Sequence, residues 1–402
     1  MTTSMARKIW IGPTWALAVL LSSLSMLGPF AVDTYIPAFA PMMADLSASP
    51  VQLQQTLSVY LVGFAVMNLF HGAISDSLGR RRVVLWGLVV FSLASLGCAN
   101  ARSIEFLIFF RALQGMVTGA GIVVGRAILR DILAPEDAQR AMNQVTIFFG
   151  IAPALAPMLG GLISEYFGWR VIFLFLAGLG LMLWALNYRF LPESLQRPQR
   201  QPFSMSNLLS GYGTLFTDRR VVLLSLASGL PFTSMFLYIL AAPAFLGEHL
   251  QWPTTDFYLF FLLTISGVML GAWANGFAAG KLSRGKQIGI GFSLMFLGAA
   301  LNVGFNLYGT MQLSLLLFPI WLLSFGWAQT VPLLTIMLLD LHPNRRGMAS
   351  SAQSFVGSIA NAVAAGVVAP VAMGSVLGLA TASTALLLCG LLTWMMVRRC
   401  IV

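Results

Sequence analysis

Residues 83–99 have the sequence VVLWGLVVFSLASLGCA, an apolar run without a charged side chain. Residues 221–245 form a second run of the same kind. Each run is long enough for a membrane-spanning helix, which needs about 20 apolar residues. Strands of a membrane barrel would alternate polar and apolar positions over about ten residues. The two runs therefore predict helices rather than strands.

The composition of the chain indicates a lipid environment. Of its 402 residues, 58% are hydrophobic and only 9% are charged, whereas a soluble domain carries about 25% charged residues. Too few polar groups are present to cover globular domains in water, and this composition also excludes disorder. We predict an all-α polytopic membrane protein, because helices satisfy their own backbone hydrogen bonds in lipid.

Breaks at proline, glycine, asparagine and charge clusters divide the chain into twelve predicted spans. The longest polar gap, residues 192–220, lies between the sixth and seventh spans. We therefore predict an N-terminal six-helix bundle (1–191), a cytoplasmic linker (192–220) and a C-terminal six-helix bundle (221–402). The predicted spans are 14–36, 52–73, 83–100, 105–128, 139–164, 169–190, 221–245, 255–278, 287–307, 312–338, 347–370 and 376–397.

The positive charges indicate the topology. All but three of the 23 lysines and arginines fall at the termini, in the central loop, or in alternate loops and the span ends beside them. The exceptions are Arg102 and Arg170 in the opposite loops and Arg111 inside a span. Cytoplasmic loops are rich in Lys and Arg, so both termini and the central loop are predicted to be cytoplasmic. The net charge of +10 is explained in this way, and no nucleic acid partner is expected.

A short repeat links the two predicted halves. Residues 35–39 (YIPAF), at the end of the first span, match residues 241–245 (AAPAF), at the end of the seventh. A weaker match links the loops at 72–82 and 276–286. A tripeptide can recur by chance in a chain rich in Ala and Phe, but similar offsets at two matching positions favour a duplicated six-helix unit.

The loop after the second span, GAISDSLGRRR beginning at Gly72, carries an ordered pattern. Gly72 and Gly79 permit a tight turn at the membrane surface, and Asp76 lies beside Arg80 and Arg81. A generic positive loop explains the arginines but not the spacing of Gly, Asp and Gly. The pattern resembles the signature of the major facilitator superfamily, Gly-x-Leu-Ala-Asp-Arg-x-Gly-Arg-Arg/Lys, with Ser in place of the first Arg. The resemblance implies that these five residues form a conformational latch on the cytoplasmic side.

The fourth span carries a charge within the membrane, Arg111. Such a charge costs at least about 2.5 kcal/mol on insertion scales, so Arg111 is expected to face the interior and to meet an anionic or carbonyl partner. Arg111, Gln114 and Thr118 share one helical face. The alternative is an Arg111 that reaches the outer membrane surface. The stretch LIFFRALQG also resembles the superfamily's Leu-x-x-x-Arg-x-x-Gln-Gly motif, whose Arg is implicated in proton coupling.

The fifth span contains Pro153 and Pro157, which remove helix hydrogen bonds and bend the helix, and then Gly160 and Gly161, which allow tight packing. Taken alone, this pattern is also explained by a kinked helix with a purely structural packing role. It is similar to the Gly-Pro-x-x-Gly-Gly stretch that marks antiporters in the superfamily, with Ala156 in place of the Gly before the proline. The resemblance favours export by exchange.

Asp33 is the one carboxylate predicted to lie well inside a span. At about 1.5 Å of rise per residue it lies at most roughly 18 Å inward from Asp45, in the same outer half as Arg111 and within its reach. Such a carboxyl group can bind a proton on one side and release it on the other. The alternative is a local backbone cap next to Pro37. The stretch DTYIPA resembles the end of the first span in the bicyclomycin/chloramphenicol resistance branch of drug–proton antiporters, which implies proton coupling through Asp33 and Arg111.

Large apolar side chains are abundant, with 29 Phe, 10 Trp and 20 Met. A core or lipid-facing position is the default for any one of them. Soft side chains also suit a promiscuous apolar pocket, and the resemblance places several of them on spans that line the superfamily's cavity. The substrate-binding candidates are Tyr35, Phe64, Gln114, Thr118, Phe149, Phe232 and Phe236.

The resemblance covers the whole chain and implies the major facilitator fold, with twelve transmembrane helices in two six-helix bundles. It implies a monomeric proton-coupled antiporter of the bacterial inner membrane that exports hydrophobic or cationic drugs, a route to antibiotic resistance. A proton-coupled metabolite transporter of the same fold is the alternative. No enzyme is expected, because the sequence shows no paired carboxylates and no nucleophile with a base. Scattered cysteines and histidines, without a Walker A or Rossmann pattern, predict no metal and no cofactor.

Overall fold

The computed structural model describes residue 10 and residues 12–133, 135–253, 256–278, 281–308 and 313–401. The side chains at 135–136, 139–140, 142–151, 154, 199, 313–315, 344 and 400–401 are outside this description. Every regular element in the described ranges is a helix. The prediction of an all-α chain is therefore confirmed.

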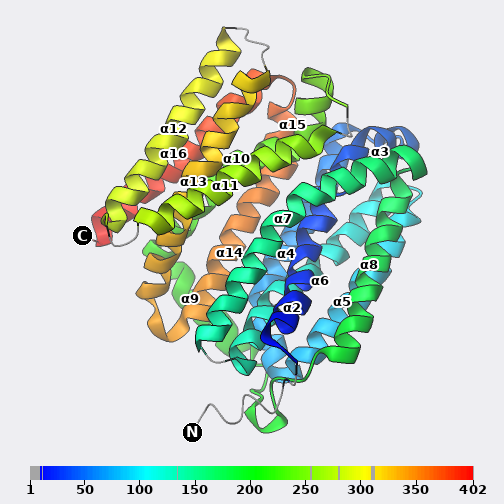
Figure 1. Ribbon diagram of the computed structural model, residues 1–402, viewed down its shortest axis with the longest axis vertical. Coiled ribbons are helices and arrows are strands. Elements are labelled where there is room, and N and C mark those ends of the chain that lie inside the picture. Colours follow the sequence, from blue (N-terminus) through cyan, green and yellow to red (C-terminus); the bar gives the residue numbers. More distant parts are fainter. Residues whose placement is uncertain are drawn as a thin grey trace. The chain divides into compact units, whose positions relative to one another are not determined.

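The chain divides into two compact units, Met1–Leu208 (unit 1) and Leu209–Val402 (unit 2). The boundary falls within residues 192–220, the predicted linker. Unit 1 runs from blue to green in Figure 1. Its elements are α2 (Thr14–Asp33), η1 (Ile36–Ala38), α3 (Phe39–Leu46), α4 (Pro50–Leu78), α5 (Arg80–Ala99), α6 (Ile104–Ile132), α7 (Pro135–Phe167), α8 (Trp169–Phe190) and η2 (Arg197–Gln199).

Unit 2 runs from green to red in Figure 1. Helix α9 (Met205–Thr217) crosses the boundary, and the sequence did not predict it. Its residue Phe216 packs against Phe355, so the end of α9 belongs to unit 2. The other elements are α10 (Arg219–Leu240), η3 (Pro243–His249), α11 (Phe257–Ala278), α12 (Arg284–Leu307), α13 (Leu313–Leu341), η5 (Pro343–Arg345), α14 (Arg346–Val363), η6 (Ala364–Val368), α15 (Ala369–Ala372) and α16 (Val376–Ile401).

Eleven segments of the described chain are long and apolar enough to cross a membrane. Helix α7 takes the place of the fifth predicted span, and it contains the whole of the predicted range 139–164. The first candidate span, Thr14–Leu46, extends beyond the predicted range 14–36 and consists of three helical pieces rather than one. The arrangement is the one expected from twelve predicted spans.

The first helix of each unit breaks at the repeated sequence. Helix α2 ends at Asp33 and is followed by the short helix η1, which has Pro37 near its start. Helix α10 ends at Leu240 and is followed by the π-helix η3, which begins at Pro243. Proline cannot donate a backbone hydrogen bond and restricts the preceding residue, so it ends the α-helix in both units. The matching breaks support the duplication inferred from the sequence.

Each unit also repeats the neighbours of its first helix. In unit 1, α2 packs against α6 and α7 (Figure 1). In unit 2, α10 packs against α13 and α14, and also against α16. In unit 1, α6 packs closely against α4. A Cβ atom on Gly115 would overlap the backbone of Tyr60. A small residue is therefore required at Gly115, as at other helix contacts in membranes.

Candidate functional site

Asp33 is the last residue of α2, where the helix breaks inside the first candidate span. Its exposed fraction is only 4%. Thr34, the next residue, donates to the carbonyl oxygen of Phe30, but the carboxyl group of Asp33 has no hydrogen bond or ion pair within the described part of the chain. The alternative of a local backbone cap is therefore not observed. Asp33 is a buried acid without a counter-charge among the described residues.

Arg111 lies on α6 and is fully buried. Its Nη1 donates to the carbonyl oxygen of Ala31 at 2.8 Å and to Oε1 of Gln114 at 2.5 Å. Its guanidinium carbon lies 4.3 Å from the ring centre of Tyr35 and 4.4 Å from that of Tyr60, within the range of cation–π attraction. The prediction of an interior arginine with a carbonyl partner is confirmed, and the alternative of an arginine at the outer surface is wrong.

The neighbours of Arg111 form a buried network, here called the Arg111 cluster: Arg111, Tyr35, Tyr60, Gln114 and Ser95. Gln114 Nε2 donates to Ser95 Oγ at 2.8 Å. The hydroxyl of Tyr35 shares a 2.9 Å hydrogen bond with Thr56. Thr118 donates to the backbone oxygen of Gln114. Three predicted substrate-binding residues, Tyr35, Gln114 and Thr118, therefore have their polar atoms engaged within unit 1.

No ion pair joins Asp33 and Arg111 in the described residues, although both lie in unit 1. Tyr60 links Arg111 to the helix that ends at Asp33, because its ring lies against Arg111 and its hydroxyl donates to the backbone oxygen of Gly28 on α2 at 3.4 Å. Arg111 keeps two buried donors, Nε and Nη2, that have no hydrogen-bond partner among the described atoms. These two N–H groups of Arg111 are therefore available to another acceptor. The sequence did not single out Tyr60 or Ser95, and their only signal is a polar atom inside an apolar run.

The predicted antiporter motif packs directly against the break in α2. Pro153 and Pro157 both lie inside the continuous helix α7. Gly160 and Gly161 are buried, and a Cβ atom on Gly160 would overlap the carbonyl oxygen of Thr34. The close approach of α7 to the residue after Asp33 therefore depends on glycine at position 160. This contact joins two motifs that are far apart in the sequence.

The remaining aromatic candidates lie apart from the Arg111 cluster. Phe64 is half-buried on α4. The side chain of Phe149 lies outside the described residues. Phe232 and Phe236 belong to α10 in unit 2, where their rings stack with centres 5.4 Å apart. Phe232 also packs on Trp327 of α13, with ring centres 4.9 Å apart.

The predicted latch differs from the expected loop. Helix α4 continues through Asp76 to Leu78, and α5 begins at Arg80, so only Gly79 lies outside a helix. The prediction of a tight loop over residues 72–82 is therefore wrong, and Gly72 is a helical residue. The junction requires glycine because Gly79 has a φ of 103°, which L-residues with a side chain rarely adopt. A single residue thus joins the two helices.

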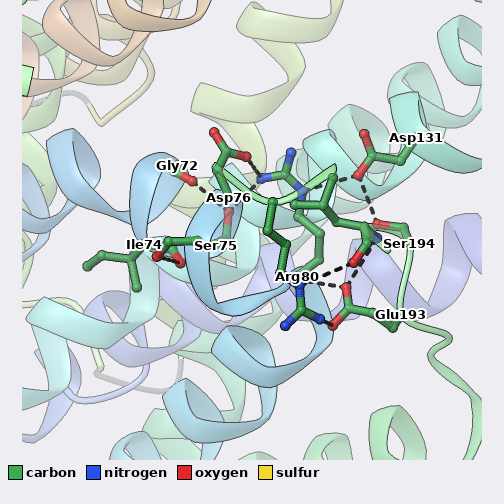
Figure 2. Close-up of polar contacts among 11 residues, drawn as sticks. Gly72, Ile74, Ser75, Asp76, Arg80, Asp131, Glu193 and Ser194 are labelled. Atoms are coloured by element: carbon green, nitrogen blue, oxygen red, sulfur yellow. Dashed lines mark hydrogen bonds and ion pairs between the residues drawn. The ribbon is translucent and has the colours of Figure 1, made fainter. Parts of the chain in front are cut away.

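Arg80 is the centre of the polar contacts at this junction (Figure 2). Its Nη1 pairs with Oδ1 of Asp76 at 2.5 Å, and its Nε pairs with Oδ2 of Asp131 at 3.1 Å. Its backbone N–H donates to Oε1 of Glu193 at 2.9 Å, and Ser194 Oγ donates to Asp131 at 2.8 Å. The junction is therefore bonded to the end of α6 and to the segment after α8.

Arg81, the other latch arginine, contacts a different element. It donates to the backbone oxygen of Tyr188 on α8 and lies over the ring of that residue. Asp131, Glu193 and Ser194 were not predicted; they are acidic or polar residues at the end of α6 and just after α8. Asp76 itself pairs with Arg80 four residues later, and its side chain stays 43% exposed.

Residues 21–365 match the family profile described as Major Facilitator Superfamily. The chain belongs to the major facilitator superfamily. A superfamily relative, multidrug resistance protein D of Escherichia coli, is 32% identical over 88% of this chain and 87% of its own length. A bicyclomycin resistance protein homolog of Haemophilus influenzae is 29% identical over 73% of this chain and 75% of its own length.

Solved structures of transporters have the same fold as this chain. The crystal structure of a nucleoside transporter, NupG, superposes with a TM-score of 0.75 over 95% of this chain and 99% of its own, at 14% identity. A bacterial homolog of the human lysosomal transporter Spinster gives a TM-score of 0.72 at 13% identity. The predictions of the major facilitator fold and of the drug antiporter branch are confirmed. The chain is a multi-pass membrane protein of a transporter superfamily.

Proposed function

We propose that this chain exports hydrophobic or cationic drugs across the inner membrane in exchange for protons, by alternating access of two six-helix bundles. Drug export is supported by two relatives whose names state bicyclomycin resistance and multidrug resistance. Proton exchange rests on one observation above all. Asp33 is buried inside a candidate span and has no counter-charge among the described residues.

Asp33 performs the exchange in this proposal. A buried carboxylate without a partner is costly, so Asp33 holds either a proton or a nearby cation. A drug cation that arrives at the carboxylate replaces the proton, which leaves to water. A proton that returns from the other side displaces the drug. Since one positive charge replaces another, the net charge at Asp33 is the same with the proton bound as with the cationic drug bound.

Arg111 supports this exchange from the same unit. Its Nη1 is held by Ala31 and Gln114, whereas Nε and Nη2 have no hydrogen-bond partner among the described atoms. We assign these two donors to the Asp33 carboxylate in the step when neither proton nor drug is bound. The contact would stabilise the charged acid and limit proton leakage. Gly160 and Gly161, with Pro153 and Pro157, set the distance between α7 and the break in α2.

The remaining assignments concern the ends of the helices. We propose that Gly72, Asp76, Gly79, Arg80 and Arg81 act as the conformational latch. The half-exposed side chain of Asp76 supports this assignment, because part of its carboxylate remains open to a further contact. The distribution of Lys and Arg supports cytoplasmic termini. We further propose a monomer without enzymatic activity, with bundle boundaries at 1–191 and 221–402.

The test is drug-induced proton release from inverted membrane vesicles that carry an imposed proton gradient. The native protein should release protons when a cationic drug is added, and Asp33→Asn should not. Asp45→Asn is the matched control, since Asp45 bonds to Arg170 and Trp169 rather than lying unpartnered. Equal proton release from Asp33→Asn and the native protein would contradict the assignment. If no drug moved protons in the native protein, the metabolite transporter would become the better reading.

A further inference from the structure

Helix α13 carries two tryptophans whose indole N–H groups differ. Trp321 Nε1 donates to Ser266 Oγ on α11 at 3.0 Å. Trp327 Nε1 is buried, and no described atom accepts its hydrogen bond. An indole nitrogen is only a donor, so a different tautomer does not explain the missing partner. A buried unsatisfied donor is destabilising and requires an explanation.

The surroundings of Trp327 are aromatic. Its ring packs on Phe232 of α10, with ring centres 4.9 Å apart and planes at 45°. Phe232 stacks in turn on Phe236, with centres 5.4 Å apart and planes at 17°. Trp327 and Phe232 are both half-buried, so part of each side chain is open to contact. The three residues, here called the Trp327 cluster, combine flat apolar surface with one directed donor.

The position along the helix fits a ligand site. Trp327 lies near the middle of α13, which spans Leu313–Leu341. Transporters of this kind bind substrate near the centre of the membrane. Ligand sites are typically apolar surfaces with a few polar groups that fix orientation. The Trp327 cluster has this composition.

We infer that Trp327 Nε1 donates a hydrogen bond to an acceptor oxygen of the substrate while an aromatic ring of the substrate packs on Phe232. This inference rests on the proposed function and specifies its substrate class as aromatic compounds that carry a carbonyl or similar oxygen. A compound of the same shape without that oxygen leaves the donor unsatisfied in the complex. Since 1.4 kcal/mol corresponds to a tenfold change in affinity, the loss of one such bond should weaken binding about tenfold.

The test measures equilibrium binding to the purified full-length protein in lipid nanodiscs. The probes are the para-benzoyl and para-benzyl derivatives of benzyltriphenylphosphonium, which differ by a carbonyl group in place of a CH₂. The native protein should bind the benzoyl probe about tenfold more tightly. Trp327→Phe keeps a ring against Phe232 but removes the donor, so it should bind both probes about equally. Trp321→Phe is the matched control and should keep the native preference.

Three results would overturn the inference. These are equal affinity of the native protein for both probes, a preference that survives in Trp327→Phe, and an equal loss of preference in Trp321→Phe. The comparison of two probes on the native protein does not depend on whether any variant folds. Binding is also independent of proton coupling. A preference with no drug-induced proton release would contradict the proposed exchange while leaving the Trp327 assignment intact.

Discussion

Unit 1 and unit 2 place different polar chemistry in similar helix arrangements. Unit 1 buries Asp33 and Arg111 beside its first helix. In the described part of unit 2, the buried polar residues are all neutral. Tyr238 on the first helix accepts from Asn302 at 2.6 Å, and Thr233 donates to Asn361 at 2.7 Å. The helix break is therefore separable from buried acidic and basic side chains. Both units have the break, but among the described residues only unit 1 places such buried side chains beside it.

The largest effect is expected from Arg111→Leu. The change removes the donor to Ala31 and Gln114, and each buried acceptor left without a partner costs about 1–3 kcal/mol. Drug-induced proton release in vesicles should fall by at least about tenfold. Asn302→Leu, which breaks the neutral pair of unit 2, is the control and should keep proton release near the native level. A similar loss of proton release in both variants would show that the buried charge of unit 1 has no special role in coupling.

A smaller effect is expected from Gly160→Ala. The added methyl group would overlap the carbonyl oxygen of Thr34, and overpacking of a tight contact typically costs about 1–3 kcal/mol. Thermal unfolding in detergent should show the loss, with reduced drug exchange because the end of α2 shifts. Gly178→Ala on α8 is the matched control, since nothing lies within 4 Å of its Cβ position. A stable, fully active Gly160→Ala would show that the contact does not position Asp33.

Tyr238→Phe sharpens the comparison from the side of unit 2. It removes the hydrogen bond from Asn302, and a net loss of about 0.5–1.5 kcal/mol is expected because the pair is neutral. The midpoint of thermal unfolding should fall slightly. The number of protons released per drug should stay unchanged. An altered ratio would indicate that unit 2 also takes part in proton coupling.

The smallest effect concerns the start of α10, outside the span. Partial burial of Asp218 works in the opposite direction, but hydrogen bonds and charge from Arg220 and a hydrogen bond from His342 hold the pKa of Asp218 below its ordinary value. A lowered pKa stabilises the folded state above the ordinary carboxyl pKa and loses this effect as the pH falls through the folded value. Near neutral pH, Asp218→Asn should therefore unfold at a lower temperature than the native protein in a thermal unfolding experiment. The difference should shrink in acid, and a constant difference would contradict the assignment.

The helices and the position of Arg111 were predictable because their causes are local. Apolar runs indicate spans, and the cost of a charge in lipid turns Arg111 toward the interior. The extension of α4 to Leu78 was missed because Gly72 suggested a turn. In the structure nothing lies within 4 Å of a Cβ position on Gly72, and within residues 72–82 the positive φ is at Gly79. The glycine pattern therefore indicated the right place for the junction between the two helices but made the connection too long.

Partners distant in the sequence were not predictable from one chain. Arg80 meets Asp131 and Glu193 only because the ends of α6 and α8 come together in the fold. Likewise, the contact of Gly160 with Thr34 depends on how α7 packs on α2. Spacing along one helix identifies a face, but it does not identify the neighbour of that face. This is why Arg111 and Gln114 were predicted together whereas Tyr60 and Ser95 were missed.

The hydrogen bond from Arg111 to Ala31 also makes the arginine a C-terminal cap for another helix. A helix that ends inside a membrane leaves carbonyl groups that water cannot satisfy, and the end of α2 is such a case. Thr34 takes the carbonyl of Phe30, and Arg111 takes that of Ala31. A lysine would keep the charge but lose the planar set of donors. Substitutions at position 111 will therefore move the helix end that carries Asp33, as well as change the charge beside it.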